Sequence, residues 1–552
     1  MRRTRQLFAA FVCAVLALAA CGSARPAPAQ PAAPPAGSTD LNPHPRDALK
    51  AGGTLRLAIQ QWITQYNVGQ VDGTEGDGVS IVELVEPQLW ILDAHGSPSL
   101  NPDVLVSAKV TATSPHQVVT YQLNPKATWS DGTPVTWQDF ATQWRTRNGT
   151  NPAYQVSDTA GYDDISDVAR GADDRAAVVT FTKPYPDWQG LFDPLLPGSA
   201  LSTPDAFNKG WIEKVPVWGG PWRIGSMDKS NQTITVVPNE KYWGAKPILS
   251  SVVYRALDTA AMTDAYLNNE VDEAPARVPE AYRRLAGAPG TAIRAGGRWD
   301  ETHVTLGKSG PLADVRVRQA IGLAINRPAV AAAQSAGLPF KVNVLSNHFF
   351  MPSQQGYQDT AGQYGQFDPA RAGSLLDQAG WARPAGGGTR VKDGKPLRLT
   401  YVVSSGSTSD VPQLVQNMLA QVGIQVDLRK VPTNDFFGQY VDRGSFDLVS
   451  FRNVDEAFTT RLLAVFRSGG DQNYGKVGSP DIDRVLDEAA TQTDRTAAIA
   501  LYNQADALIW AAGHSVELFQ TPEILAVRSG LANVGAYGLA GDRQMVDTGW
   551  LK

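Results

Sequence analysis

Apolar and polar residues alternate in four segments of the first half of the chain, as they do in strands with one buried face. These segments are 52–59, 117–123, 175–181 and 233–237. After residue 136 the apolar residues have the spacing of a helix, because Trp137, Phe140 and Trp144 would fall on one helical face. Thr136 and Asp139 precede this face with the spacing of a capping box, in which Asp replaces the usual Glu or Gln. The first half is therefore predicted to be mostly β-structure with inserted helices.

The second half alternates between helical and strand patterns. Residues 312–327 carry one apolar stripe at helical spacing and end in Arg327, whose charge suits the negative end of a helix. From residue 397, strand and helix patterns follow one another at 397–403, 411–423, 424–431, 433–442 and 446–451. This β-α-β-α-β order predicts a parallel sheet with right-handed crossovers. A last helix near 494–511 and a strand-like run at 514–520 complete the pattern.

The N-terminus has the pattern of an export signal. Arginines near the start precede an apolar run, 7–20, that is shorter than the roughly 20 residues a membrane-spanning helix needs. The Leu-Ala-Ala before Cys21 resembles the lipobox of bacterial lipoproteins, in which the cysteine is lipidated and the chain is cut before it. Residues 1–20 are therefore predicted to be a lipoprotein signal peptide. Cys21 would carry the lipid that anchors the chain at the cell membrane, on its extracytoplasmic side.

The cysteine count fits this interpretation. The chain has 2 Cys, and the other one, Cys13, would be lost with the signal peptide. The folded part then has no thiol and can form no disulfide, despite export to an oxidising compartment. Residues 21–50 are predicted to be the lipidated cysteine and a Pro/Ala-rich tether, which has too little apolar bulk to fold.

Composition limits the remaining possibilities. A chain of 552 residues with 43% hydrophobic and 19% charged residues is expected to fold into two or three parts around large cores. The net charge of -5, without a long block of Lys or Arg, gives no electrostatic footprint for nucleic acid. The 14 Trp and 16 Tyr fit either core packing or an aromatic-lined ligand cavity.

Candidate catalytic chemistry is scarce. None of the 6 His stands at a metal-ligand spacing, and no phosphate-binding loop, dinucleotide fingerprint or serine nucleophile elbow occurs. His303 and His514 flank the positions where the pattern changes, and we interpret both as structural. The acidic loop 69–78 lacks the ligand spacing of a calcium-binding EF-hand loop. We therefore expect that the protein is not an enzyme and that it holds neither a metal nor a cofactor.

The α/β pattern offers one positive indication. Ligands of open α/β sheets bind beyond the carboxyl ends of the strands, and the predicted strand 446–451 ends just before Arg452 and Asp455. Asp455 would accept a cationic group, and Arg452 an anionic one. The alternative is a surface loop whose charges are only solvated.

Six segments, in order along the chain, together resemble the family 5 extracytoplasmic solute-binding proteins, which serve ABC importers of oligopeptides, dipeptides, nickel and some oligosaccharides. The segments are 123–141, 218–224, 239–247, 256–272, 310–327 and 473–489. The resemblance implies an α/β fold of the type II periplasmic-binding-protein kind, in the large cluster with three subdomains. Two lobes would close on a ligand in the cleft between them, with hinge strands near 302–306 and 516–520.

The resemblance also implies domain boundaries and site residues. Lobe I would span 51–304 and be β-rich, lobe II would span 305–516, and 517–552 would return to lobe I. Asp455 is the best match for the aspartate that holds the peptide ammonium in peptide-binding members, although the nearby Arg452 could neutralise it or serve an anionic ligand. Four aromatic residues would border the cleft: Trp218, Trp222, Trp62 and Tyr66.

The leading hypothesis is a lipid-anchored, monomeric solute-binding protein that captures an oligopeptide and delivers it to an ABC permease in the membrane. A second hypothesis keeps the fold but changes the cargo to an oligosaccharide or glycoconjugate, with the Trp residues as stacking platforms. A third is a lipoprotein of this fold that regulates envelope assembly without transport. An enzyme is the least supported hypothesis.

Overall fold

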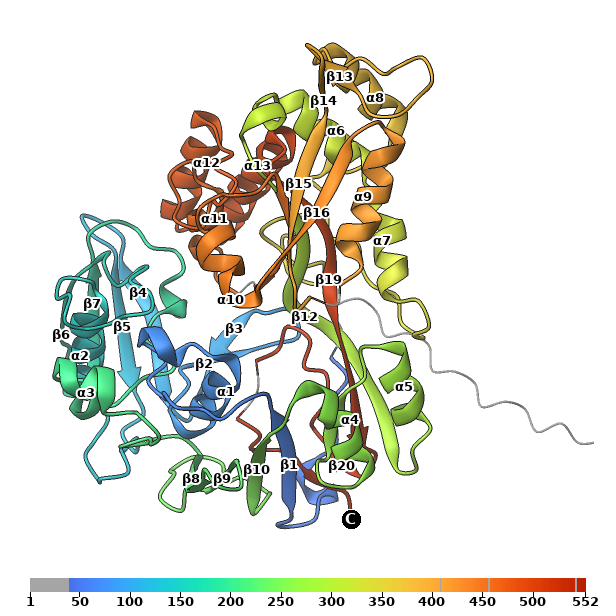
Figure 1. Cartoon of the computed structure of the whole chain (residues 1–552). Helices are drawn as coiled ribbons and strands as arrows, with labels where there is room; N and C mark the ends of the chain where they lie inside the picture. The colour runs from blue at the N-terminus through green and yellow to red at the C-terminus, as the bar shows by residue number, and fades with distance from the viewer. Residues whose placement is uncertain (1–38, 408, 455–456, 542–543) are drawn as a thin grey trace, which may run out of the picture.

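The computed structural model describes residues 39–552 except 408, 455–456 and 542–543. The predicted signal peptide, Cys21 and Asp455 therefore lie outside the described residues. Within the described part, no helix is both long and apolar enough to cross a lipid bilayer. Figure 1 shows a lower and an upper part connected by two long strands, β12 (Thr291–Leu306) and β19 (Ser515–Arg528).

An antiparallel sheet with strand order β4-β5-β7-β6 forms the outer portion of the lower part (Figure 1). Its strands are β4 (Leu105–Ala112), β5 (Val118–Leu123), β6 (Ile165–Arg170) and β7 (Ala176–Phe181). Helix α2 (Trp137–Arg147) packs on this sheet, and its predicted capping box is confirmed. The Thr136 hydroxyl accepts from Gln138 N at 3.3 Å, and the Asp139 carboxylate accepts from Thr136 N at 2.8 Å.

A second sheet of the lower part has the order β1-β10-β9-β8, in which only β1 and β10 run parallel. Its strands are β1 (Thr54–Ile59), β8 (Trp222–Asp228), β9 (Thr233–Pro238) and β10 (Ser251–Ala256). The buried residues of helix α1 (Gly76–Val85) join the same core cluster as β1 and β8. The strands predicted at 52–59 and 233–237 are thus confirmed.

The third sheet links the two parts and has seven strands. The order is β11-β19-β12-β17-β15-β16, with β18 pairing to β12 off this path. Besides β12 and β19 it contains β11 (Glu273–Pro275), β15 (Arg398–Ser404), β16 (Gln425–Val431), β17 (Leu448–Val449) and β18 (Arg452–Val454). Because β15 runs parallel to both β16 and β17, the predicted β-α-β-α-β unit is confirmed.

Two details of that unit differ from the prediction. The helix expected at 433–442 is a single α-turn, α10 (Thr433–Asp435), followed by a π-helix, η7 (Phe436–Val441). The strand expected at 446–451 is only Leu448–Val449, and the chain then forms β18 against β12. Arg452 therefore lies in a strand, not in a loop beyond one.

The segment 312–327, predicted to be one helix, ends its apolar stripe with α6 (Val315–Ala324) and continues into the first residue of a second helix. Its stripe residues are buried, as expected, in α6 and at Ile325 just after it. The prediction that Arg327 closes this helix is wrong, because Asn326 caps a new helix, α7 (Arg327–Gln334), through Ala329 N. The buried Arg327 guanidinium instead donates to Gly365 O at 2.6 Å and Leu345 O at 2.6 Å.

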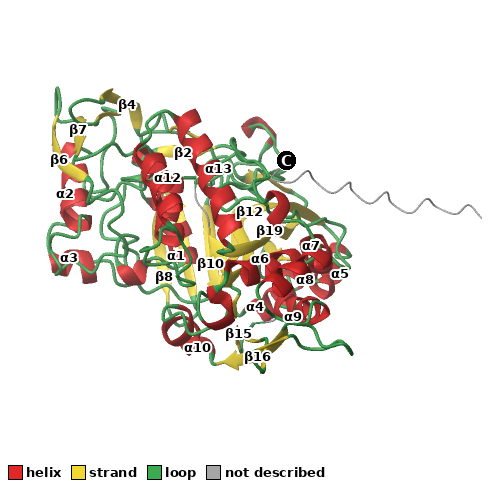
Figure 2. Ribbon diagram, turned by 90° about the horizontal axis from the view of Figure 1, so that it is seen from above, coloured by secondary structure: helices red, strands yellow, loops and turns green. Residues whose placement is uncertain are grey.

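Helices cover both faces of the upper sheet, with α6, α8 and α9 to one side and α11, α12 and α13 to the other (Figures 1 and 2). Their bounds are α8 (Pro369–Gln378), α9 (Val411–Gln421), α11 (Leu463–Phe466), α12 (Pro480–Thr491) and α13 (Arg495–Ala512). The lower part adds α3 (Pro204–Lys209), α4 (Thr259–Leu267) and α5 (Pro279–Ala286). Short strands complete the fold: β2 (Trp90–Leu92), β3 (Pro98–Leu100), β13 (Val391–Lys392), β14 (Lys395–Pro396), β20 (Leu531–Ala532) and β21 (Gly549–Trp550).

The C-terminal segment packs back on the start of β1. Trp550 O accepts from Lys50 N at 2.7 Å, and the Trp550 indole donates to Thr54 O at 3.1 Å. Strands β12 and β19, which connect the two parts, span the proposed boundaries near 304 and 516, and the division into lobes at these positions stays a prediction.

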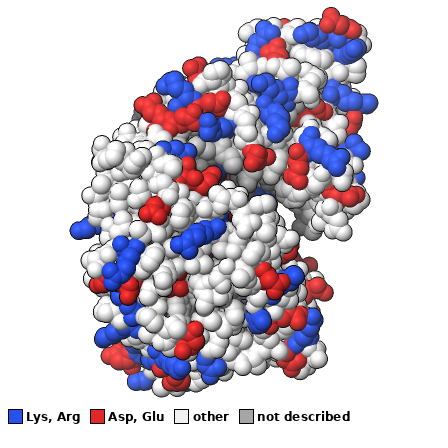
Figure 3. Space-filling view, turned by 90° about the vertical axis from the view of Figure 1, so that its left-hand side faces the viewer, with Lys and Arg blue, Asp and Glu red and all other residues white. Residues whose placement is uncertain are grey.

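On the face drawn in Figure 3, Lys and Arg are interspersed with Asp and Glu.

Candidate functional site

The pairing of β12 with β19 gathers ionisable side chains in the interior. Glu301 and His303 lie two residues apart on β12 and so point to the same face of the sheet. A bulge between Thr302 and His303 shifts the register, so that His303 pairs with Glu517 of β19. An unshifted ladder would pair His303 with the apolar Leu518. The bulge therefore brings a second carboxylate beside the imidazole.

The resulting cluster is tight and buried. His303 Nδ1 lies 2.7 Å from Glu301 Oε1, and the exposed fractions of Glu301, His303 and Glu517 are 4%, 5% and 3%. One ligand-type atom from each of these three side chains lies within 4.8 Å of those of the other two. We call Glu301, His303 and Glu517 the strand triad.

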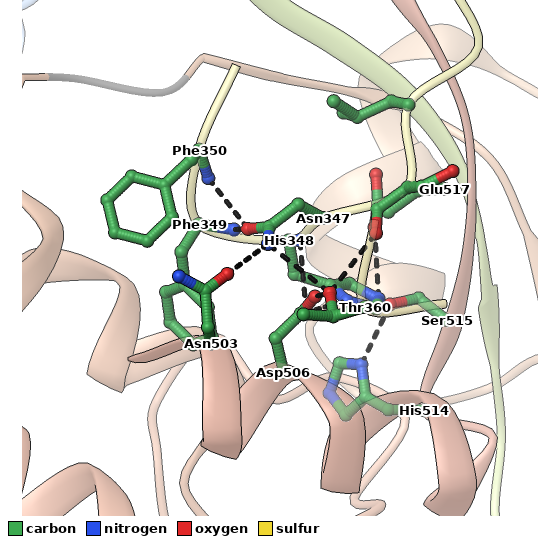
Figure 4. Close-up of polar contacts among 12 residues, drawn as sticks. Asn347, His348, Phe349, Phe350, Thr360, Asn503, Asp506, His514, Ser515 and Glu517 are labelled. Atoms are coloured by element: carbon green, nitrogen blue, oxygen red, sulfur yellow. Dashed lines mark hydrogen bonds and ion pairs between the residues drawn. The ribbon is translucent and has the colours of Figure 1, made fainter. Parts of the chain in front are cut away.

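A second histidine approaches the strand triad from the loop after residue 345 (Figure 4). His348 Nε2 lies 3.4 Å from Glu517 Oε1. Its other ring nitrogen, Nδ1, lies 2.5 Å from Asp506 Oδ1 on α13, and its backbone N donates to the same oxygen at 3.0 Å. The Thr360 hydroxyl also donates to Asp506. Asp506 therefore fixes the orientation of His348, with Nε2 directed towards Glu517.

The same loop is held in place by an asparagine. Asn347 Oδ1 accepts from the backbone N of Phe349 at 2.9 Å and of Phe350 at 3.0 Å, and its amide donates to Asn503 Oδ1 at 2.8 Å (Figure 4). The rings of Phe349 and Phe350 then pack against Tyr502 of α13. The His348 loop is thus anchored to α13 on both sides of the histidine.

These groups border a cavity of about 110 Å³. Its polar lining comes from Glu301, His303, Thr305, His348, Arg452, Gln472, His514, Ser515 and Glu517, and its aromatic lining from Phe437, Phe451, Phe466 and Tyr474. His303 meets Phe451 edge-on, with ring centroids 4.7 Å apart. A volume of this size has room for an ion with waters or for a small part of a larger ligand.

Burial shapes the electrostatics of this cavity. Desolvation raises the pKa of Glu517 well above its usual range, and the neighbouring Glu301 carboxylate adds to the shift. Desolvation also lowers the pKa of His303, and it lowers that of His514 to about 3, with the charge of His348 contributing to the second shift. Desolvation lowers the pKa of His348 too, but Asp506 and Glu517 outweigh it, so the net shift is upward. The cavity therefore combines one favoured imidazolium with two neutral imidazoles.

Connecting segments beside the outer sheet of the lower part contact the upper part at residues 458–461. The Asp187 carboxylate accepts from both Thr460 N, at 2.7 Å, and the Thr460 hydroxyl, at 2.6 Å. Arg461 pairs with Asp158 at 3.2 Å. A Cβ added at Gly190 would lie 2.8 Å from the Phe458 ring, so glycine permits this close approach. The two parts are therefore in direct contact away from the crossing strands.

Of the residues predicted to bind a ligand, the structure places Arg452 at this cavity. Its guanidinium pairs with Asp300 Oδ2 at 2.9 Å and its side chain is 51% exposed. The pairing of β18 with β12, in which Thr302 lies opposite Arg452, brings it there. Asp455 lies outside the described residues, so its predicted role stays a prediction.

The four predicted aromatic residues lie elsewhere, in or against the core of the β1-β10-β9-β8 sheet. Trp222 and Tyr66 have no exposed surface, and the Trp222 indole donates to Gln544 O at 2.6 Å. Trp218 and Trp62 are partly exposed, and the Trp62 indole donates to Glu213 at 3.2 Å. In this structure, Trp218 and Trp62 alone among these four keep surface that a ligand can reach.

The sequence interpretation missed Glu301, Glu517 and His348, and assigned His303 a structural role. The sequence did contain a signal. At the end of β12 the polar residues Glu301, His303 and Thr305 occupy every second position, and the positions after His303 and Thr305 are the apolar Val304 and Leu306. Such alternation marks one face as polar although both faces are buried. No local pattern marks His348, which reaches the cluster from a loop.

The sequence and the fold both resemble those of known proteins. The family model described as "Bacterial extracellular solute-binding proteins, family 5 Middle" matches residues 101–520, which is most of the chain. The chain belongs to this family. As a family 5 protein it binds a solute for an ABC importer on the extracytoplasmic side and is not an enzyme.

Three relatives show how far the similarity extends. This family 5 protein is 38% identical over 510 residues to the oligopeptide-binding protein OppA of Mycobacterium tuberculosis, covering 91% of this chain and 86% of OppA. It is 30% identical over 333 residues to the "Probable monoacyl phosphatidylinositol tetramannoside-binding protein LpqW" of Mycobacterium tuberculosis, covering 60% of this chain and 51% of LpqW. The solved structure of the periplasmic EDTA-binding protein EppA matches with a TM-score of 0.84 at 25% identity, covering 93% of this chain and 98% of EppA. The predicted two-lobed fold is thereby confirmed.

Proposed function

We propose that this family 5 protein captures oligopeptides outside the cytoplasmic membrane and hands them to an ABC permease, as a monomer held by lipid on Cys21. The observation that carries the proposal is the 38% identity to OppA, which extends over 91% of this chain and 86% of OppA. Closure on a peptide would use the contacts that Asp158 and Asp187 make with the segment 458–461.

Native mass spectrometry with defined ligand pools tests the proposal. The purified chain is mixed with a pool of peptides of two to ten residues and, separately, with a pool of manno-oligosaccharides. We expect adducts with peptide masses and a thermal shift that only the peptide pool produces. Binding of manno-oligosaccharides without peptides would favour the second candidate below, and binding of neither pool would overturn a transport role for both classes.

The second candidate function is the capture of a glycoconjugate, which the similarity to LpqW favours. That similarity covers only 51% of LpqW, so it is a weaker support than the similarity to OppA. Trp218 and Trp62 are the accessible candidates for stacking against sugar rings. Under this candidate, Trp218→Ala would abolish oligosaccharide binding while Asp455→Ala would leave it unchanged.

We predict that Asp455→Ala weakens the binding of peptides that have a free α-amino group. A carboxylate that pairs with a buried ammonium contributes about 2–5 kcal/mol when its removal leaves the partner uncompensated. Calorimetry with a free and an N-acetylated form of one peptide checks this, because the acetylated peptide should lose no affinity to the substitution. Asp471→Ala, which changes an exposed carboxylate, is the control. Equal affinity of wild type and Asp455→Ala for the free peptide would remove Asp455 from the site.

We also predict that Asp187→Ala weakens the contact between the lower and the upper part. The substitution removes two hydrogen bonds that Thr460 donates to a charged acceptor, a loss of about 1–3 kcal/mol after competition with water. Small-angle X-ray scattering should show a larger mean radius for the variant, and its peptide affinity should fall. Asp174→Ala removes only an exposed pair with Arg170 and should change neither quantity. Unchanged scattering and affinity in Asp187→Ala would show that this contact does not hold the two parts together.

A further inference from the structure

The strand triad has the donor set and the compactness of a metal site. An imidazole and two carboxylates place one ligand-type atom each within 4.8 Å of the others, and all three side chains are buried. Ligand atoms around one first-row metal ion, each about 2.0–2.2 Å from it, lie within such distances of one another. The triad is built on two paired strands, which hold donors more rigidly than loops do.

Polar atoms around the cavity support a polar occupant. Glu517 Oε2, His348 Nε2 and His514 Nε2 are buried and have no hydrogen-bond partner among the described residues. All three belong to side chains that line the same cavity of about 110 Å³. Buried polar groups in folded proteins are almost always satisfied by protein, water or an ion. Three such atoms around one cavity therefore indicate a site for a polar or charged occupant.

The charges favour a cation as that occupant. Glu301 and Glu517 bring two carboxyl groups into one buried cluster, where a bound cation would stabilise both in the ionised form. Asp506 accepts from His348 Nδ1 and thereby directs Nε2 towards Glu517, where a bound cation would displace the Nε2 proton (Figure 4). A carboxylate that orients a histidine in this way is the usual arrangement behind metal-binding histidines. The arrangement leaves His348 available as a fourth donor.

We propose that Glu301, His303 and Glu517 bind one divalent transition-metal ion at the base of this cavity, with His348 as the adjacent donor. The mixed imidazole and carboxylate set favours ions of the Zn²⁺ and Ni²⁺ class over Ca²⁺ and Mg²⁺, which prefer oxygen ligands alone. The site opens into the cavity, so the ion keeps a coordination position for water or for a donor atom of a bound solute. This proposal does not depend on the class of solute that the cleft takes.

Metal titration of the purified chain tests the proposal. The chain is treated with a chelator, passed through a desalting column and titrated with ZnCl₂ in a calorimeter, with bound zinc counted by mass spectrometry. We expect one Zn²⁺ per chain and no comparable uptake of Ca²⁺ or Mg²⁺. Absence of stoichiometric Zn²⁺ and Ni²⁺ uptake by the wild type would overturn the proposal, whatever the peptide-binding experiments show.

Matched variants locate the ion. Glu517→Gln and His303→Gln should each weaken Zn²⁺ binding by at least about 100-fold, since even changes behind the ligands cost 10–100-fold. Glu523→Gln makes the same change elsewhere on β19, and His95→Gln changes an exposed histidine, so both should bind Zn²⁺ like the wild type. Wild-type affinity in Glu517→Gln and His303→Gln would place the ion elsewhere.

X-ray absorption of the zinc-loaded wild type covers the case in which the triad variants do not fold. The expected spectrum shows one or two imidazoles in the coordination shell, and loading of the double control variant His95→Gln/Glu523→Gln should leave it unchanged. A shell without imidazole, or one that changes in the control variant, would overturn the assignment.

Discussion

Asp506→Ala should lower the free energy of unfolding by about 3–5 kcal/mol, the usual loss when one partner of a buried charged pair is removed. Asp506 has no exposed surface and accepts from His348 Nδ1, from His348 N and from the Thr360 hydroxyl. Desolvation lowers the pKa of His348, and Asp506 is the first of the charges that raise it again. The substitution therefore removes the counter-charge of a buried imidazolium and strands a backbone N–H donor.

Urea unfolding at pH 7 measures the effect. Asp506→Asn should lie between wild type and Asp506→Ala, because an amide oxygen can still accept from His348 N while the charge is gone. Asp487→Ala on α12 breaks only a half-exposed pair with Arg467 and should cost less than about 1 kcal/mol. A loss below about 1 kcal/mol in Asp506→Ala would show that the His348 loop does not depend on this carboxylate.

Elements whose stability is local could be predicted from the sequence. The capping box before α2 and the apolar stripe of α6 depend on residues three or four positions apart, and both are confirmed. The unit from β15 to β17 was predictable because each of its segments has its own clear period. The errors fall where one segment depends on a distant one. Arg327 begins α7 and inserts its guanidinium between carbonyl groups of two loops, which no local period encodes.

The candidate site was less predictable for the same reason. Glu517 faces His303 only because a bulge shifts the register of two strands more than 200 residues apart in the chain. His348 is directed by Asp506, which lies 158 positions away. For the aromatic residues, the sequence suggested ligand contact where the structure shows burial. Trp and Tyr are common both in cores and in ligand cavities, and Trp222 and Tyr66 are fully buried here. A residue type indicates what a side chain can do, whereas tertiary packing decides whether a ligand can reach it.

We expect Asp193→Asn to remove part of the pH dependence of the free energy of unfolding. The Asp193 carboxylate is buried and accepts from Leu89 N at 2.6 Å, and no Lys or Arg among the described residues forms an ion pair with it. Desolvation raises its pKa from 3.8 to about 7, although hydrogen bonds from Leu89 N and Trp90 N oppose the shift. The folded chain therefore holds the proton more strongly than the unfolded chain does.

The sign of the effect follows from this proton affinity. Below about pH 4 the group is protonated in both states, and its full contribution to stability is present. Between about pH 4 and pH 7 the unfolded chain releases the proton first, so the free energy of unfolding falls as the pH rises. Above about pH 7 the loss is complete and reaches up to about 4 kcal/mol for a shift of this size.

Asp193→Asn is neutral at every pH and keeps an oxygen that can accept from Leu89 N. Its stability relative to the wild type should therefore rise steadily from pH 4 to pH 8, by up to about 4 kcal/mol. Thermal or urea unfolding at pH 4, 5, 6, 7 and 8 measures this difference, in which contributions from other buried acids such as Glu86 cancel because both proteins contain them. Asp205→Asn, on an exposed face of α3, should run parallel to the wild type. A constant difference between Asp193→Asn and wild type across this range would mean that Asp193 stays ionised in the folded protein and that its two backbone donors outweigh the cost of burial.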